Sequence, residues 1–337
     1  MVMERLASLR ADYADVAGFP FQYFFCPILW EDEEVELCRA HVVNKAFPES
    51  DRSWTIQRAD VDNWFGSLFE NDFLSIKAMD QPVIGKAFSD KDTFRRFRPR
   101  LRVDGIEVDY YLAHGPVPET HTGGELVIDG RAVPIGIKLL PSEFQSLQEG
   151  TWVFDVVRDV RLAAFVSTLK AAHLSMFHML GYRYALSAGG RFVGKTILGD
   201  LYLRSQGKER SRALSLAHEH CGPYVNMVRP VIKMPAGFGG TVTDHLVHFF
   251  TSGGVPWAVM TFVRTSDQNH AAVLPIMDTT DSQEYFHRFL ESPPKTIEVR
   301  TGHIDGGRVQ MLPTSQTIEW PDANFGASSS NDESRYD

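Results

Sequence analysis

Three short stretches decide the fold of the N-terminal part of the chain: VELCRAHVVN at residues 35–44, WTIQR at 54–58 and DVDNWFG at 60–66. Apolar residues alternate over 35–43, and a period of two is typical of a strand. The second stretch predicts another strand, and the proline, serine and aspartate between the two predict a loop. The sequence therefore predicts two strands joined by a loop.

A helix is predicted directly after the second strand. Its apolar residues recur at helical spacing, at Phe65, Leu68, Phe69, Phe73 and Ile76. Either Asp60 or Asp62 is placed to cap that helix. In the resulting strand–loop–strand–helix unit, His41 lies near the end of the first strand and Asn63 lies at the start of the helix.

These stretches resemble the core of the HNH nucleases, which have the ββα-metal fold. The resemblance rests on AHVV at residues 40–43 and DNWFG at 62–66, with Glu70 where one subgroup often has a glutamate. It covers residues 26–72, roughly a seventh of the chain. It implies an endonuclease that hydrolyses phosphodiester bonds in DNA with a metal ion, as bacterial and phage proteins of restriction or defence often do.

The resemblance also implies roles for single residues. His41 would be the general base that deprotonates the attacking water, a role that suits an imidazole near neutral pH. Asn63 would bind the catalytic metal or orient the loop of His41, and Asp62 or Asp60 would be a second metal ligand. The cofactor implied is Mg²⁺ or another divalent cation, which would stabilise the scissile phosphate.

The chain departs from the family pattern at two places. Many members carry an acidic metal ligand before the histidine, where this chain has Ala40. The subgroup also carries four zinc-binding cysteines, of which only Cys26 remains here. The other three positions hold Leu29, Ala59 and Asp62. We therefore expect no structural zinc. The alternative function is a catalytically degenerate HNH scaffold that binds nucleic acid or protein.

A row of arginines follows the HNH-like segment and is the predicted nucleic-acid-binding element. Its members are Arg95, Arg96, Arg98, Arg100 and Arg102. The last three alternate with apolar residues, so they would share one face of a strand and could contact phosphates. The alternative is the solvated outer face of an edge strand.

A second phosphate-binding hypothesis comes from the string GGRFVGKT at residues 189–196, which matches the Walker A pattern. Gly189 and Gly194 would shape the loop, Lys195 would contact the terminal phosphates and Thr196 would contact Mg²⁺. A buried apolar strand should precede such a loop, but the stretch that precedes this one is short and charged. The alternative is a glycine-rich turn.

Composition limits the remaining possibilities. The 337 residues are 43% hydrophobic and 23% charged, which is typical of a globular protein and excludes a chain disordered throughout. The net charge of −9 disfavours non-specific coating of nucleic acid by the whole surface. The three cysteines fit no disulfide framework, and no apolar run approaches the ~20 residues of a membrane span. We expect a cytoplasmic protein with DNA as its partner and no membrane contact.

The predicted fold class is α+β, with three regions. Residues 1–105 form the HNH-like module, 106–323 a larger mixed α/β domain of unassigned fold, and 324–337 a disordered tail. The clearest helix covers 158–180, where apolar residues step by four and three. His173 lies on its apolar stripe and is predicted to be a core histidine.

Overall fold

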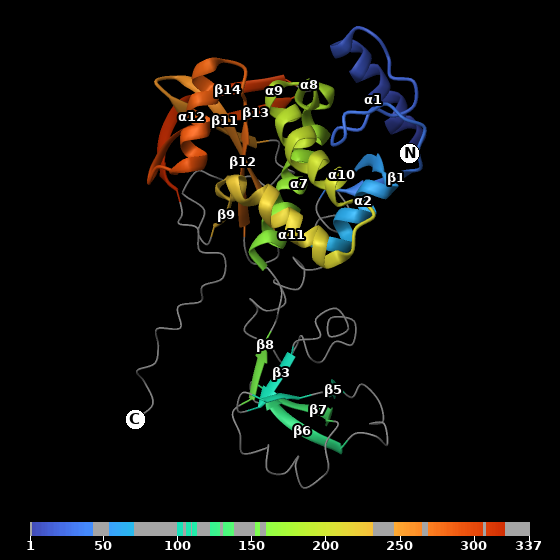
Figure 1. The fold of residues 1–337 in the computed structure, drawn as a ribbon. Coiled ribbons are helices and arrows are strands. Elements are labelled where there is room, and N and C mark those ends of the chain that lie inside the picture. The colour runs from blue at the N-terminus through green and yellow to red at the C-terminus, as the bar shows by residue number, and fades with distance from the viewer. Residues whose placement is uncertain are drawn as a thin grey trace. The chain divides into compact units, whose positions relative to one another are not determined.

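The computed structural model contains both helices and sheets, in agreement with the predicted α+β class (Figure 1). It describes the backbone of six strands between residues 100 and 155 and, elsewhere, residues 2–42, 54–70, 160–231, 246–264, 269–305 and 308–320. Among these described residues, no helix is long and apolar enough to cross a membrane.

The chain divides into two compact units. One joins Met1–Glu70 to Arg161–Asp337, and the other is Asn71–Val160. This division differs from the predicted one, because the second unit begins well before residue 106 and the chain then returns to the first unit. The predicted tail, 324–337, lies outside the described residues.

The first unit begins with α1 (Val2–Ala17), which is followed by the predicted strand–strand–helix segment. β1 (Leu37–His41) pairs with β2 (Trp54–Arg58) in an antiparallel hairpin. α2 (Ala59–Phe65) begins at the next residue and continues as a π-helical turn, η2 (Gly66–Glu70). The predicted order of elements is therefore confirmed. We refer to residues 37–41 and 54–70 as the ββα segment.

Two details of the ββα segment differ from the prediction. β1 is shorter than the predicted strand, which covered 35–43. The predicted helix cap is wrong, because α2 starts at Ala59 and both Asp60 and Asp62 lie inside its first turn. Arg58 precedes the helix and makes no side-chain cap hydrogen bond. The aspartates are therefore available for contacts with other elements.

The predicted long helix is confirmed as α7 (Val160–Leu180). His173 is fully buried in it, with Nδ1 2.9 Å from Tyr184 Oη and Nε2 3.1 Å from the Pro27 carbonyl oxygen. Burial lowers the pKa of His173 to about 4, so it is a neutral core residue as predicted. The helices after α7 are α8 (Tyr182–Ala185), α9 (Ala188–Arg191), η3 (Phe192–Gly199), α10 (Asp200–Ser205), α11 (Arg210–Cys221) and η4 (Gly222–Met227).

An antiparallel six-stranded sheet completes the first unit, with the order β14-β13-β10-β11-β12-β9. α12 (Thr280–Glu291) packs against it through aromatic contacts among Phe250, Trp257, Phe289 and Trp320. The strands are β9 (Val228–Val231), β10 (Leu246–Ser252), β11 (Val255–Arg264), β12 (Asn269–Pro275), β13 (Thr296–Asp305) and β14 (Arg308–Glu319).

The second unit contains two three-stranded antiparallel sheets, with the orders β4-β3-β8 and β5-β7-β6. The turn-rich composition of this part of the chain predicted strands and loops, and the strands are confirmed. They are β3 (Arg100–Val103), β4 (Ile106–Val108), β5 (Tyr110–Leu112), β6 (Thr122–Ile128), β7 (Arg131–Ile137) and β8 (Trp152–Asp155).

Candidate functional site

The two residues with predicted catalytic roles lie on different elements of the ββα segment. His41 is the last residue of β1, where it is half-buried and opposite Trp54 in register. Asn63 is exposed in the middle of α2. His41 is therefore at the end of the first strand, as predicted, whereas Asn63 lies in the middle of the helix rather than at its start.

Strand alternation places His41 and Cys38 on opposite faces of β1. Burial raises the pKa of Cys38 to about 12 and the nearby Asp62 adds to the shift, so Asp62 lies on the Cys38 face. Side chains alternate between the two faces of a strand, which places His41 and Arg39 on the opposite face. The predicted pair of His41 and Asp62 is therefore not brought together on one face.

Lys170 holds two of the carboxylates. Its Nζ lies 2.8 Å from Asp62 Oδ1 and 2.6 Å from Glu70 Oε1, and the lysine is only 2% exposed. Burial opposes the charge of Lys170, but the carboxylates of Glu70 and Asp62 outweigh it and raise its pKa above the ordinary value. The Phe65 ring lies 5.5 Å from Nζ. Asp62 and Glu70 thus share one internal cation.

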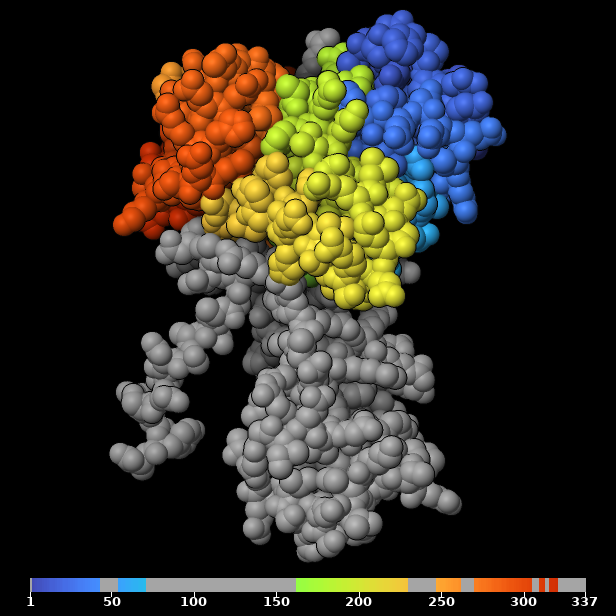
Figure 2. All heavy atoms as spheres, viewed as in Figure 1, coloured from blue at the N-terminus to red at the C-terminus, as the bar shows by residue number. Residues whose placement is uncertain are grey.

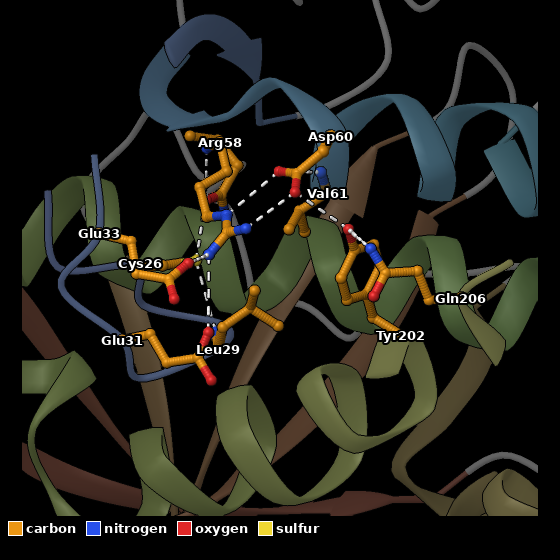
Figure 3. Close-up of polar contacts among 10 residues, drawn as sticks. Cys26, Leu29, Glu31, Glu33, Arg58, Asp60, Val61, Tyr202 and Gln206 are labelled. Carbon is orange, nitrogen blue, oxygen red and sulfur yellow. Dashed lines mark hydrogen bonds and ion pairs between the residues drawn. The ribbon is translucent and has the colours of Figure 1, made fainter. Parts of the chain in front are cut away.

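Arg58 holds the third carboxylate in a two-pronged contact (Figure 3). Its Nε donates to Asp60 Oδ1 at 3.1 Å and its Nη2 donates to Asp60 Oδ2 at 2.8 Å. Tyr202 also donates to Asp60 Oδ2, at 3.1 Å. Burial opposes ionisation of Asp60, but the hydrogen bonds from Arg58 and from the Val61 N–H lower its pKa below the ordinary value. Asp60 is therefore an ionised partner of Arg58.

Arg58 also binds the acidic loop that precedes β1. Its Nη1 donates to Glu33 at 2.7 Å and lies 3.6 Å from a carboxylate oxygen of Glu31. The Asp60 hydrogen bond is the main cause of the raised pKa of Arg58, and the contact with Glu33 adds to it. One guanidinium thus links this loop to the start of α2.

Four residues stand where the HNH subgroup carries zinc-binding cysteines, and they do not fit a zinc ion. Cys26 donates from Sγ to Gln57 Oε1 at 3.2 Å and accepts from the Leu29 N–H at 3.4 Å. Burial raises the pKa of Cys26 to about 12, so it is a thiol rather than the thiolate that binds zinc. Leu29 and Ala59 are buried apolar residues. Asp62, the fourth, is paired with Lys170.

Two of the three residues predicted to bind the catalytic metal contact basic side chains. Asp60 and Asp62 are each engaged by a basic side chain, and Ala40 is a fully buried methyl group. Within the described parts of the chain, no group of three or more His, Cys, Asp or Glu side chains is placed to hold a metal ion. Asn63, the remaining predicted ligand, is exposed and is held by neither Arg58 nor Lys170.

The arginine row lies largely outside the described residues, which include only Arg100 and Arg102. Both are in β3, the central strand of its sheet, so the edge-strand alternative is wrong. The register places Asp155 opposite Arg100 and Glu107 opposite Arg102.

The Walker A hypothesis is wrong, because Gly189–Thr196 is helical rather than a loop. A Cβ at Gly189 would lie 1.7 Å from the Pro275 carbonyl oxygen, and a Cβ at Gly194 would lie 2.3 Å from another backbone oxygen. These glycines allow close packing of helix against backbone. Lys195 and Thr196 are exposed on that helix.

No protein-family model, no curated protein and no solved structure matches the chain. The resemblance to HNH nucleases therefore stays a prediction, and the functional argument depends on the geometry of the ββα segment.

Sequence reasoning missed the residues that complete this geometry. Lys170 and Tyr202 lie 108 and 142 residues beyond their aspartate partners, so no local pattern pairs them. One signal existed for Lys170, because it is the only lysine of α7 and lies directly between the apolar residues Leu169 and Ala171. Burial of a lysine requires a partner of opposite charge.

Proposed function

We propose that the chain is a nucleic-acid-binding protein built on an HNH-like ββα scaffold in which buried ion pairs take the place of the metal centre. The observation that carries the proposal is the contact of Lys170 with both Asp62 and Glu70. These are acidic residues of the α2–η2 helix where a metal-dependent enzyme of this kind would need free oxygen ligands.

The charge balance supports the absence of metal-dependent cleavage. A divalent cation at Asp62 would have to displace a lysine that is 2% exposed, and the displaced ammonium would lose its buried partners. Asp60 is held in the same way by Arg58, with Tyr202 as a further donor. We therefore assign no proton-transfer step to His41 and no metal role to Asn63.

The end of the hairpin that carries Arg39 and Trp54 supports a binding role. The guanidinium of Arg39 lies 4.9 Å from the centroid of the Trp54 ring, and Arg39 is exposed. Guanidinium groups bind phosphates and indole rings stack with bases, so this end of the hairpin has the side-chain chemistry of a nucleic-acid contact.

The proposal is tested with supercoiled plasmid and a fluorescent DNA duplex. The wild-type chain and the His41→Ala variant are expected to bind the duplex with affinities within about twofold of each other. Neither is expected to nick the plasmid with Mg²⁺ or Mn²⁺. Arg39→Gln is expected to weaken binding several-fold, because it removes a phosphate contact. Failure of the wild-type chain to bind DNA or RNA would overturn the proposal.

A metal-dependent DNA endonuclease is the second candidate. It is favoured by the order β1, β2, α2 and by the places of His41 and Asn63 within it. In that function His41 would act as the base and Asn63 would contact Mg²⁺. Plasmid cleavage that a chelator and His41→Ala each abolish would establish this function in place of the first.

A further inference from the structure

The turn between α10 and α11 concentrates basic residues on a chain with a net charge of −9. Residues 204–212 contain four basic side chains and a single acidic one, Glu209. The basic residues are Arg204, Lys208, Arg210 and Arg212. All four are exposed. The space-filling view shows the α10–α11 segment, in yellow, on the surface of the first unit (Figure 2). We refer to residues 204–212 as the basic turn.

The basic turn is fixed beside the ββα segment by contacts at both of its ends. Arg210 donates to the carbonyl oxygens of Ser67 and Leu68, at 2.9 Å and 3.3 Å. At the α10 end, Tyr202 donates to Asp60. The backbone of the basic turn therefore lies next to α2 and η2.

The charges of the basic turn contribute little to the stability of the fold. Lys208 and Arg212 have no ion-pair partner within the described part of the chain, and Arg204 lies 3.7 Å from Asp200. Arg212 and Lys208 also flank the start of α11, where positive charge is unfavourable with the helix dipole. By contrast, exposed Arg183 is paired at 2.9 Å. Lys208 and Arg212 are therefore available to contact an external anion.

We infer that the basic turn contacts the phosphate backbone of a nucleic acid duplex, and this inference rests on the proposed function. Several exposed cations along one turn suit successive phosphates of an extended polyanion. Arg210 anchors the turn to η2, so Lys208 and Arg212 supply the contacts. Binding here would place the duplex against the surface that includes α2.

The test uses the full chain and a fluorescein-labelled duplex, with affinity measured by anisotropy at several salt concentrations. The Lys208→Gln/Arg212→Gln variant is expected to bind about tenfold more weakly at 0.1 M salt. Its log–log salt slope should shrink by about two, since each lost phosphate contact removes roughly 0.9. The matched control is Arg183→Gln/Arg288→Gln, which removes two exposed and ion-paired cations elsewhere. It should stay within about twofold of wild type.

The outcomes separate this inference from the proposed function. Binding by the wild-type chain with equal affinity and salt slope in both variants would overturn the inference alone. No binding of any nucleic acid by the wild-type chain would overturn both. Loss of binding to phosphatidylserine vesicles in the Lys208→Gln/Arg212→Gln variant, with DNA affinity unchanged, would assign the basic turn to a membrane surface and also overturn it. Circular dichroism and thermal unfolding show that both variants remain folded.

Discussion

The ββα segment and the six-stranded sheet bury their polar groups in opposite ways. The ββα segment is held by charged pairs, with Lys170 on Asp62 and Arg58 on Asp60. The core of the sheet is mainly apolar and aromatic, although Arg229 of β9 is also buried, and its buried His270 is neutral, because burial lowers its pKa to about 4. Charged pairs are costly to bury, and they are concentrated in the segment that carries the candidate site.

The sheet stabilises the first unit mainly through apolar burial, whereas the ββα segment depends on its ion pairs. Burial of apolar surface stabilises the fold regardless of which side chains supply that surface, whereas a buried ion pair stabilises it only when both partners are present. Changes in the two regions should therefore differ in size and in their response to pH.

The largest effect is expected from Lys170→Met. This change keeps the side-chain length but leaves Asp62 and Glu70 without their cation, and breaking a buried pair costs about 3–5 kcal/mol. The measurement is the free energy of unfolding from urea denaturation. The control is Lys195→Met, at an exposed position, which should change it by less than about 0.5 kcal/mol.

A second variant tests the physical reason. Adding Asp62→Asn and Glu70→Gln to Lys170→Met removes the unpaired charges and should recover much of the lost stability. A loss of less than about 1 kcal/mol in the single variant would contradict the role given to Lys170.

The next effect is a dependence on acid pH that comes from the sheet. The folded-state pKa of His270 lies below its ordinary value, so His270 contributes stability that is present above pH 6.5 and lost as the pH falls toward about 4. The unfolded chain takes up the proton first, which costs about 1.4 kcal/mol for each pH unit below 6.5. His270→Gln should flatten the stability curve between pH 6.5 and 5 by that slope. An unchanged slope would show that His270 is not buried as a neutral group.

The Lys170 contact should not respond in this range. The raised pKa of Lys170 means that its contribution is present below its ordinary value of 10.5 and is lost only above that value. Lys170→Met should therefore lower the stability curve evenly between pH 5 and 8. This pH response distinguishes the ββα segment from the sheet.

The smallest effect is expected from Asp60→Asn. Asp60 is partly exposed, so loss of its charge should cost about 1 kcal/mol even though Arg58 loses a partner. Its lowered pKa adds stability above the ordinary value of 3.8, and this stability is lost as the pH falls below it. The variant should therefore match wild type more closely in strong acid. A cost above about 3 kcal/mol would place Asp60 in a fully buried pair.

The sequence predicted the elements of the ββα segment but not the long-range contacts that hold its carboxylates. Alternating and helical periods are local, so β1, β2 and α2 could be found from residues 35–66 alone. The contact of Asp62 with Lys170 spans 108 residues, and it forms only because the chain returns to the first unit at Arg161. The composition of the intervening stretch contains no signal for this return.

The Walker A match failed for a related reason. A string of glycines is compatible with a phosphate loop and with close helix packing, and only the neighbours decide between them. Here the backbone at Pro275 lies where a side chain at Gly189 would stand. The sequence around Gly189 does not specify that distant contact.

We propose that basic side chains occupy the acidic residues of the ββα segment, where an HNH nuclease would bind a metal ion. Mn²⁺ binding, followed by electron paramagnetic resonance, tests it most directly on the wild-type chain and the Asp62→Asn variant. We predict that wild type and Asp62→Asn bind the same amount of Mn²⁺, because Lys170 already pairs with that carboxylate. A stoichiometric Mn²⁺ site that is present in wild type and lost in Asp62→Asn would contradict the account.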